Sequence, residues 1–232
     1  MTEQGELDDS AARSEILSKV RALKSKPNSH ADVARANAMA YMARHDRGPK
    51  PYPCADVVDL FVTRAKDMLS TVSILDSEAL VAQECRRYLD ESGITTEKVS
   101  IWPSLSGLDW SALKESIGAS IEFGAPTGSE LLGISGVAYA LAETGTLVFS
   151  SLPDDPASTH LLPETHIAIV KAEQVVHSME DVFERMRVEG RAMPRALNFV
   201  SGPSRTADIE QTIVLGAHGP YRVHVILIRA NP

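Results

Sequence analysis

One loop near the end of the chain combines small polar residues with a single arginine. Ser201, Gly202, Ser204 and Thr206 surround Arg205, directly after a run of apolar residues. An arginine guanidinium holds a carboxylate or phosphate through two parallel hydrogen bonds, and glycine allows the backbone to approach a ligand closely. Together with the hydroxyl groups, these residue types predict a binding site for a small anion.

The segments around this loop would place it at an edge of a sheet. The apolar run 196–200 predicts a strand, and open α/β sheets bind ligands beyond the carboxyl ends of their strands. Asp208, with Gln211 three residues later, predicts a capped helix over 208–216. The free amides at the start of such a helix favour an anion. Alternatively, the loop is only a capped connection and Arg205 is a surface charge.

A second polar group lies in the middle of the chain. Glu143, Thr144, Gly145 and Thr146 separate two apolar runs and predict a tight turn between antiparallel strands. A carboxylate at this place could act as a general base or as a nucleophile. The alternative is a turn residue that bonds its own backbone.

Histidine and cysteine give weaker signals. His166 lies just before the apolar run 167–170 and is a candidate ligand contact, whereas His224 lies within such a run and is expected to be structural. The two cysteines, Cys54 and Cys85, are not in a C-x-x-C motif, and an iron–sulfur cluster takes about four thiolates. No metal site and no cofactor are therefore expected in this chain.

The composition is that of an ordinary globular protein. The 232 residues are 44% hydrophobic and 23% charged, and the net charge is −8. Nucleic-acid binding is not expected, because Lys and Arg form no block. A membrane span is not expected either, since no apolar run is long enough. The acidic N-terminus has no apolar core and is not a secretory signal, so we expect a cytoplasmic protein.

Helical and strand-like segments alternate along most of the chain. This order predicts an α/β fold with a largely parallel sheet and flanking helices. A hairpin over 136–151 interrupts the alternation. The predicted helices span 56–70, 77–91, 178–188 and 208–216, with a short one near 111, and the predicted strands span 71–75, 98–102, 119–123, 167–170, 196–200 and 222–228.

Residues 1–55 are expected to form an N-terminal helical arm, and 56–232 the α/β domain. Apolar residues at helical spacing predict one helix within 12–23 and a second over 31–45. The proline-rich connector 48–53 follows. Such an arm could pack on the domain, contact another subunit or cover a site.

Several blocks of sequence resemble the LUD domain family, most closely its lactate utilization protein C branch. They are SGPSRTADIE at 201–210, GAHGP at 216–220, AETGTL at 142–147 and LPETH at 162–166. The resemblance covers the chain from about residue 56 to its end. It implies an α/β fold similar to the NagB/RpiA/CoA-transferase-like superfamily. It also implies a role in oxidising L-lactate to pyruvate together with two iron–sulfur partner proteins, which would carry the clusters.

The matched motifs identify the positions of a candidate site. The resemblance assigns no firm catalytic roles, and Glu143 is the candidate catalytic residue. The candidate ligand-binding residues are Thr144, Gly145, Thr146, His166, Ser201, Gly202, Ser204, Arg205, Thr206 and Asp208.

Three functions remain open at this point. The first is a subunit of an L-lactate-oxidising system that binds an anionic ligand. The second is a stand-alone enzyme similar to CoA-transferases or isomerases, in which Glu143 acts. The third is a non-catalytic interaction or regulatory subunit, in which the 201–220 loop is structural.

Overall fold

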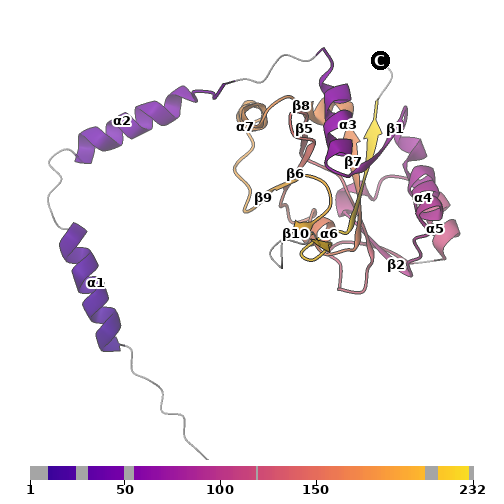
Figure 1. Cartoon of the computed structure of the whole chain (residues 1–232), viewed down its shortest axis with the longest axis horizontal. Helices are drawn as coiled ribbons and strands as arrows, with labels where there is room; N and C mark the ends of the chain where they lie inside the picture. The colour runs from indigo at the N-terminus through magenta and orange to yellow at the C-terminus, as the bar shows by residue number, and fades with distance from the viewer. Residues whose placement is uncertain (1–9, 25–30, 50–54, 119, 207–213, 230–232) are drawn as a thin grey trace, which may run out of the picture. The chain divides into compact units, whose positions relative to one another are not determined.

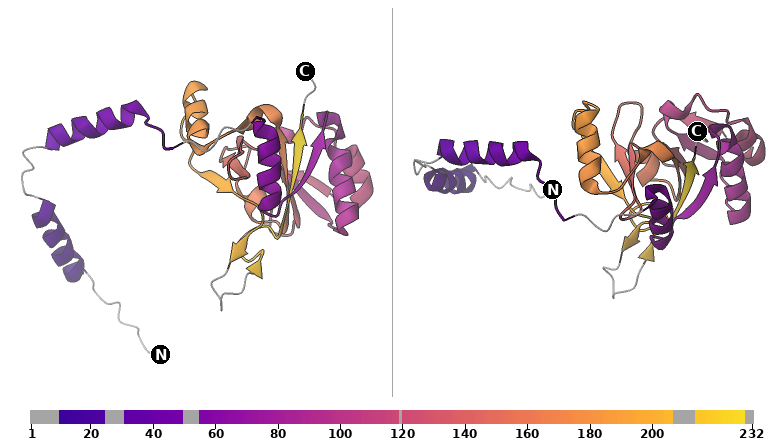
Figure 2. Two further views of the ribbon diagram at one scale, coloured as in Figure 1. Left: turned by 45° about the horizontal axis from the view of Figure 1, so that its top comes forward. Right: turned by 90° about the horizontal axis from the view of Figure 1, so that it is seen from above.

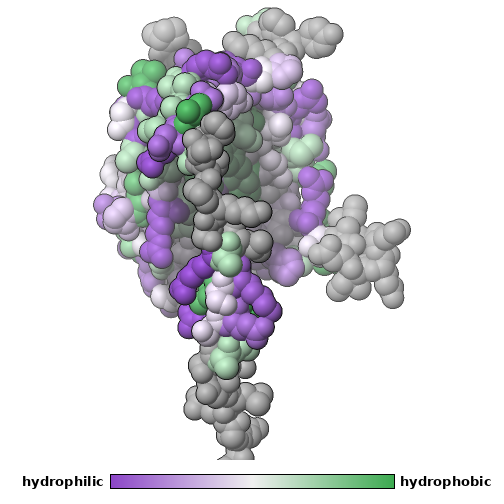
Figure 3. Space-filling model, turned by 90° about the vertical axis from the view of Figure 1, so that its left-hand side faces the viewer, coloured by the Kyte–Doolittle hydropathy of each residue, from purple (hydrophilic) through white to green (hydrophobic). Residues whose placement is uncertain are grey.

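The computed structural model describes residues 10–24, 31–49, 55–118, 120–206 and 214–229. The chain divides into two units, Met1–Pro49 and Lys50–Pro232. The first contains α1 (Ser10–Lys24) and α2 (Ala31–Arg44), at the places where helices were predicted. Within the described part of the chain, no helix is long and apolar enough to cross a membrane. On the face drawn in Figure 3, hydrophilic residues alternate with smaller hydrophobic groups.

The second unit is built on a six-stranded sheet in which every neighbouring pair is parallel (Figure 1). This confirms the predicted α/β fold with its parallel sheet and flanking helices. In spatial order the strands are β1 (Thr71–Leu75), β12 (Arg222–Ile228), β7 (Thr165–Lys171), β4 (Leu132–Ser135), β2 (Lys98–Ile101) and β3 (Ser120–Phe123).

A second sheet has four strands, in the order β8 (Val175–Val176), β5 (Tyr139–Leu141), β6 (Thr146–Ser150) and β9 (Leu197–Val200). The predicted hairpin is confirmed, because β5 and β6 pair antiparallel around the turn at Glu143. The strand predicted over 196–200 exists as β9, but it pairs antiparallel with β6 and lies outside the parallel sheet. The rule for ligands at parallel strand ends therefore does not apply to the loop that follows it.

The helix predicted over 208–216 is wrong at its end. Val214–Leu215 forms strand β11, which pairs antiparallel with β10 (Arg205–Thr206). Residues 208–213 lie outside the described residues, and with them the predicted N-cap. The favourable helix start that the sequence suggested for an anion thus has no support in the described part of this loop.

Helices cover the parallel sheet on both faces (Figure 2). The α-helices of this unit are α3 (Val57–Asp67), α4 (Val81–Ser92), α5 (Ser111–Ile117), α6 (Ser158–Leu161) and α7 (Met179–Val188), and the 3-10 turns are η1 (Glu78–Leu80), η2 (Pro103–Leu105) and η3 (Ala172–Gln174). Their ends follow ordinary capping chemistry. Asp56 accepts a hydrogen bond from the Val58 amide at 2.8 Å, and Gly93 ends α4 in the left-handed conformation.

Three apolar cores hold the layers together. One lies under α4 and α5 and includes Leu113 and Ile226. The second fills the space between the two sheets and α3, with Phe61 and Phe149 fully buried. The third lies between the four-stranded sheet and α7, around Tyr139. Each fully buried aliphatic side chain stabilises the fold by about 1.5–3 kcal/mol relative to an exposed one.

Candidate functional site

The two polar motifs, which are more than fifty residues apart, meet in the structure. Strand β6 begins where β9 ends, because Leu147 pairs with Val200 in the antiparallel register. The Thr146 hydroxyl therefore lies 2.6 Å from the Ser201 hydroxyl, and 2.6 Å from that of Thr144. Three predicted site residues thus form one row of hydrogen-bonded hydroxyl groups.

The two motif glycines lie against the C-terminal end of α3. A Cβ at Gly145 would come within 2.4 Å of the Ala65 amide nitrogen, and one at Gly202 within 1.9 Å of the Met68 carbonyl oxygen. Both glycines have positive φ, at +64° and +70°. Glycine is needed at both positions because the helix backbone approaches so closely. This contact alone is enough to require glycine at both positions.

The rest of the 201–206 loop is held by backbone bonds. The Ser204 amide donates to the Pro220 carbonyl at 2.9 Å, and the Ser204 carbonyl accepts from the Gly216 amide at 2.9 Å. Thr206 is half-buried in β10, while Arg205 is exposed and its guanidinium contacts the Met68 sulfur at 3.8 Å.

Glu143 lies beside the row of hydroxyl groups, at the start of the turn. It is half-buried, and its amide donates to the His177 carbonyl at 3.1 Å. Its neighbour Thr144 is exposed, so solvent reaches this turn. Asp208, the remaining candidate of the loop, lies outside the described residues.

His166 lies apart from these motifs, in the core between the two sheets. It is fully buried, and its Nε2 is 2.8 Å from the Ser135 hydroxyl. Burial, with a smaller contribution from His160, lowers the pKa of His166 to about 3. The imidazole is therefore neutral at physiological pH. Its Nδ1 has no hydrogen-bond partner among the described residues.

A second buried histidine accompanies it, which the sequence did not single out. His160 of α6 stacks on Phe149 with 3.9 Å between the ring centroids, and its Nε2 is 3.2 Å from the Asn198 amide. Burial lowers the pKa of His160 to about 4. One histidine in a four-residue helix carries no pattern from which its contacts could be predicted.

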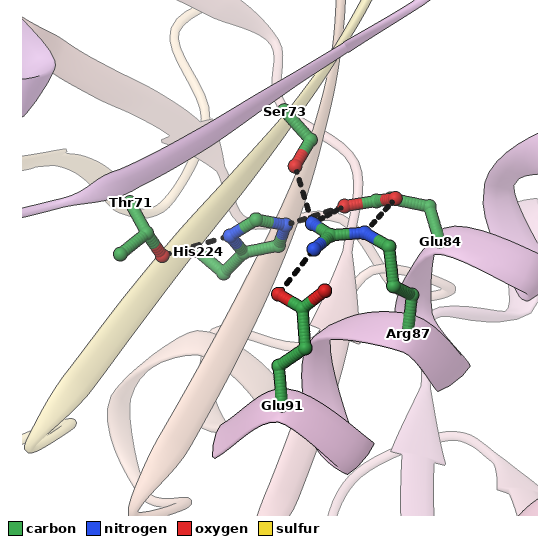
Figure 4. A network of polar contacts seen from close by, with 6 residues as sticks. All are labelled: Thr71, Ser73, Glu84, Arg87, Glu91 and His224. Carbon is green, nitrogen blue, oxygen red and sulfur yellow. Dashed lines mark hydrogen bonds and ion pairs between the residues drawn. The ribbon is translucent and has the colours of Figure 1, made fainter.

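A third polar group joins α4 to β1 and β12 on the other face of the sheet (Figure 4). The His224 Nδ1 is 2.8 Å from the Thr71 hydroxyl, and its Nε2 is 3.5 Å from Glu84. Arg87 binds Glu84 and also Ser73, the latter at 3.1 Å. Burial raises the pKa of Glu84, but hydrogen bonds from Arg87 and Ser73 outweigh burial and lower it. These contacts agree with the structural role that the sequence predicted for His224.

Within the described residues, no group of three or more His, Cys, Asp or Glu side chains could hold a metal ion. The candidate chemistry is therefore carried by two sets of groups. One is the row of hydroxyl groups with Glu143 and Arg205 near α3. The other is the neutral pair His160 and His166 between the sheets.

Comparisons with known proteins identify part of the chain. Residues 129–228 match the LUD domain model. Proteins named Lactate utilization protein C from Halalkalibacterium halodurans and Bacillus subtilis are each 39% identical over 100 residues, which is 42% of this chain and 44% and 42% of theirs. The protein of that name from Bacillus licheniformis is 32% identical over 148 residues, 59% of this chain and 56% of the relative. The matches thus span about half of these relatives or less.

The fold has a relative among solved structures. A DUF162 family protein from Deinococcus radiodurans has a TM-score of 0.55 at 23% identity, and the match covers 77% of this chain and 99% of that one. At this identity the likeness shows the fold alone. Both polar motifs begin within the segment that matches the family model. Residues 129–228 of this chain are therefore similar to the LUD domain family, which is the resemblance that the motifs indicated.

Proposed function

We propose that this chain is a component of an L-lactate utilization system and works with iron–sulfur partner proteins that oxidise L-lactate to pyruvate. The observation that carries the proposal is the 39% identity over 100 residues to proteins named Lactate utilization protein C. The chain has two cysteines, fewer than the roughly four thiolates of an iron–sulfur cluster. This count supports the assignment of the clusters to the partners.

Gene deletion in the source organism tests the proposal. The deletion strain should lose growth on L-lactate as the sole carbon source and keep growth on glucose. A plasmid copy of the gene should restore growth on lactate. Normal growth of the deletion strain on lactate would contradict the proposed function.

The partner claim has a separate test. An affinity-tagged chain purified anaerobically from lactate-grown cells should retain proteins that contain iron and acid-labile sulfide. Recovery of the chain without iron, from cells that need it for growth on lactate, would refute the partner claim alone.

We further propose that the loop from Ser201 to Asp208 binds a small anion that bears a carboxylate or a phosphate. The exposed Arg205 guanidinium and the hydroxyl groups of Ser201 and Ser204 support this role. A ligand that binds only the native state raises the unfolding temperature. Phosphate, a sugar phosphate or a CoA ester should therefore stabilise the chain, and Arg205→Gln should abolish the effect. If none of these anions stabilises the wild-type chain, the loop is structural.

Glu143 is the proposed acting carboxylate if the chain turns over a substrate by itself. Its half-buried position beside the exposed Thr144 supports that role. Glu143→Gln should then remove the turnover of the isolated chain, with Glu164→Gln, a surface carboxylate paired with Arg222, as the matched control.

A further inference from the structure

A small cavity lies at the carboxyl edge of the parallel sheet, away from both polar motifs. Its volume is about 310 Å³. The residues that line it lie at, or shortly after, the carboxyl ends of four of the six strands. Ile169 and Lys171 belong to β7, Ile228 ends β12, Glu78 follows β1, and a segment after β2 supplies the remaining wall. Parallel strands end at the same edge, toward which the β12 arrow points in Figure 1. At this edge open α/β sheets bind their ligands.

The inner part of the cavity is apolar. Ile169 and Ile228 belong to the core under α4 and α5, and Leu105 and Leu108 pack against the same core from the segment after β2. Gly107 lies between these leucines in the lining. The four aliphatic side chains around this part suit a short aliphatic group of a ligand.

The mouth of the cavity carries one cation. Lys171 pairs with Ile228 in the sheet register, and its ammonium lies 2.5 Å from the Glu78 carboxylate. This hydrogen bond raises the pKa of Lys171, so the side chain stays charged. Both side chains are about half exposed, at 45% and 44%. Ion pairs with that exposure contribute little to stability, so an incoming carboxylate can replace Glu78 at small cost.

The lining of the cavity also includes one hydroxyl group, that of Ser104. Ser104 lines the cavity and donates to the Asp155 carboxylate at 2.6 Å. Its oxygen can accept from a ligand hydroxyl, and its proton can rotate away from Asp155 to donate to a ligand oxo group. A volume of 310 Å³ is at the lower end of the range for small-molecule sites, which suits a ligand of few atoms.

We propose that this cavity binds a short-chain carboxylic acid that bears a hydroxyl or oxo group next to the carboxylate. The acid's carboxylate replaces Glu78 as the partner of Lys171, its second oxygen reaches Ser104, and its alkyl group enters the apolar part. The choice of a 2-hydroxy or 2-oxo acid rests on the proposed lactate function. The place of the cavity and its single cation do not depend on that function.

Ligand-observed NMR titration of the full chain with L-lactate and with pyruvate tests the assignment. Lys171→Gln should weaken the binding of both acids by at least about tenfold, because a charge-assisted hydrogen bond is lost. Glu78→Gln should have the opposite effect and tighten binding severalfold, since the competing carboxylate is gone. Lactamide, an uncharged analogue of lactate, should not bind the wild-type chain.

Two control variants separate this site from other cations. Lys98 forms a similarly exposed ion pair with Glu122, at the other edge of the sheet, so Lys98→Gln should leave binding unchanged. Arg191→Gln should also leave it unchanged, because Arg191 pairs with Glu189 after α7 and does not line the cavity. Thermal unfolding of each variant shows whether it folds.

Several results would overturn the assignment. These are no binding of either acid at millimolar concentration, unchanged binding by Lys171→Gln, or equal binding of lactamide. Weaker binding by Glu78→Gln would also count against it, because Glu78 would then be a ligand contact. Failure in these titrations with growth on lactate still dependent on the gene would refute the cavity and leave the proposed function standing.

Discussion

Replacing the motif glycines by alanine tests whether they serve the contact with α3. In Gly202→Ala the new Cβ would lie 1.9 Å from the Met68 carbonyl oxygen, so the end of α3 or the loop has to move. The positive φ of +70° adds a cost of about 1–2 kcal/mol for any residue with a Cβ. Overpacking of this kind costs a further ~1–3 kcal/mol.

Gly93 provides the matched control. It has a φ of +63°, close to that of Gly202, but a Cβ there would meet no atom within 4 Å. Gly93→Ala therefore carries the backbone cost without the contact, at about 1–2 kcal/mol. Gly145→Ala, with its Cβ 2.4 Å from the Ala65 nitrogen, should resemble Gly202→Ala.

Thermal unfolding followed by circular dichroism measures the difference. In a domain of this size 1 kcal/mol changes the unfolding temperature by about 2–4 °C. We expect a decrease of about 2–8 °C for Gly93→Ala, and a further decrease of about 2–12 °C for Gly145→Ala and Gly202→Ala. If Gly202→Ala unfolds at the same temperature as Gly93→Ala, the contact with α3 is not what requires glycine. A role in the approach of a ligand would then account for it.

Three further experiments test the buried polar groups. The buried His166 has a pKa of about 3, against about 6.5 when unfolded, so only the unfolded state takes up a proton between these values. Stability is thus fully present above pH 6.5 and falls as the pH decreases through this range, by about 2 kcal/mol between pH 7 and 5. Urea unfolding should show this slope, and His166→Gln should reduce it. Arg87→Met should cost about 2–3 kcal/mol, because Glu84, with a side chain only 9% exposed, loses its partner. The double variant Arg87→Met/Glu84→Gln should recover part of that loss. If Arg87→Met is as stable as the wild type, the pairing does not stabilise the fold. Thr146→Val should cost about 1 kcal/mol by removing the middle hydroxyl of its row, whereas Thr146→Ser should be close to wild type in its unfolding temperature.

The sequence predicted most elements of the parallel sheet because local and tertiary signals agree there. The strands 71–75 and 222–228 were predicted at the bounds that the structure has, and the helix predicted over 77–91 ends one residue later, at Ser92. Strand β4 was not predicted, since its four residues include Gly133. A tertiary contact requires glycine at this position, because a Cβ there would lie 2.0 Å from the Thr159 carbonyl oxygen.

The candidate site was predicted less completely. The sequence predicted Thr146 and Ser201 as candidate site residues, but only the antiparallel pairing of β6 with β9 shows that their hydroxyl groups are within hydrogen-bond distance. The helix over 208–216 was predicted from a capping pattern around Asp208. At Val214 the pairing with β10 prevails over that pattern. Local capping signals cannot report the pairing of a segment with another strand.

The place of β12 within the sheet has a consequence for synthesis of the protein. This strand lies between β1 and β7, and Thr71 meets His224 across 153 residues of chain. A ribosome that adds about 5–20 residues per second needs about 8–30 s to make the intervening polypeptide. Throughout that interval the nascent β1 has no hydrogen-bonding neighbour of its own. Any translation product that stops before residue 222 leaves β1 and β7 as separate, open edges.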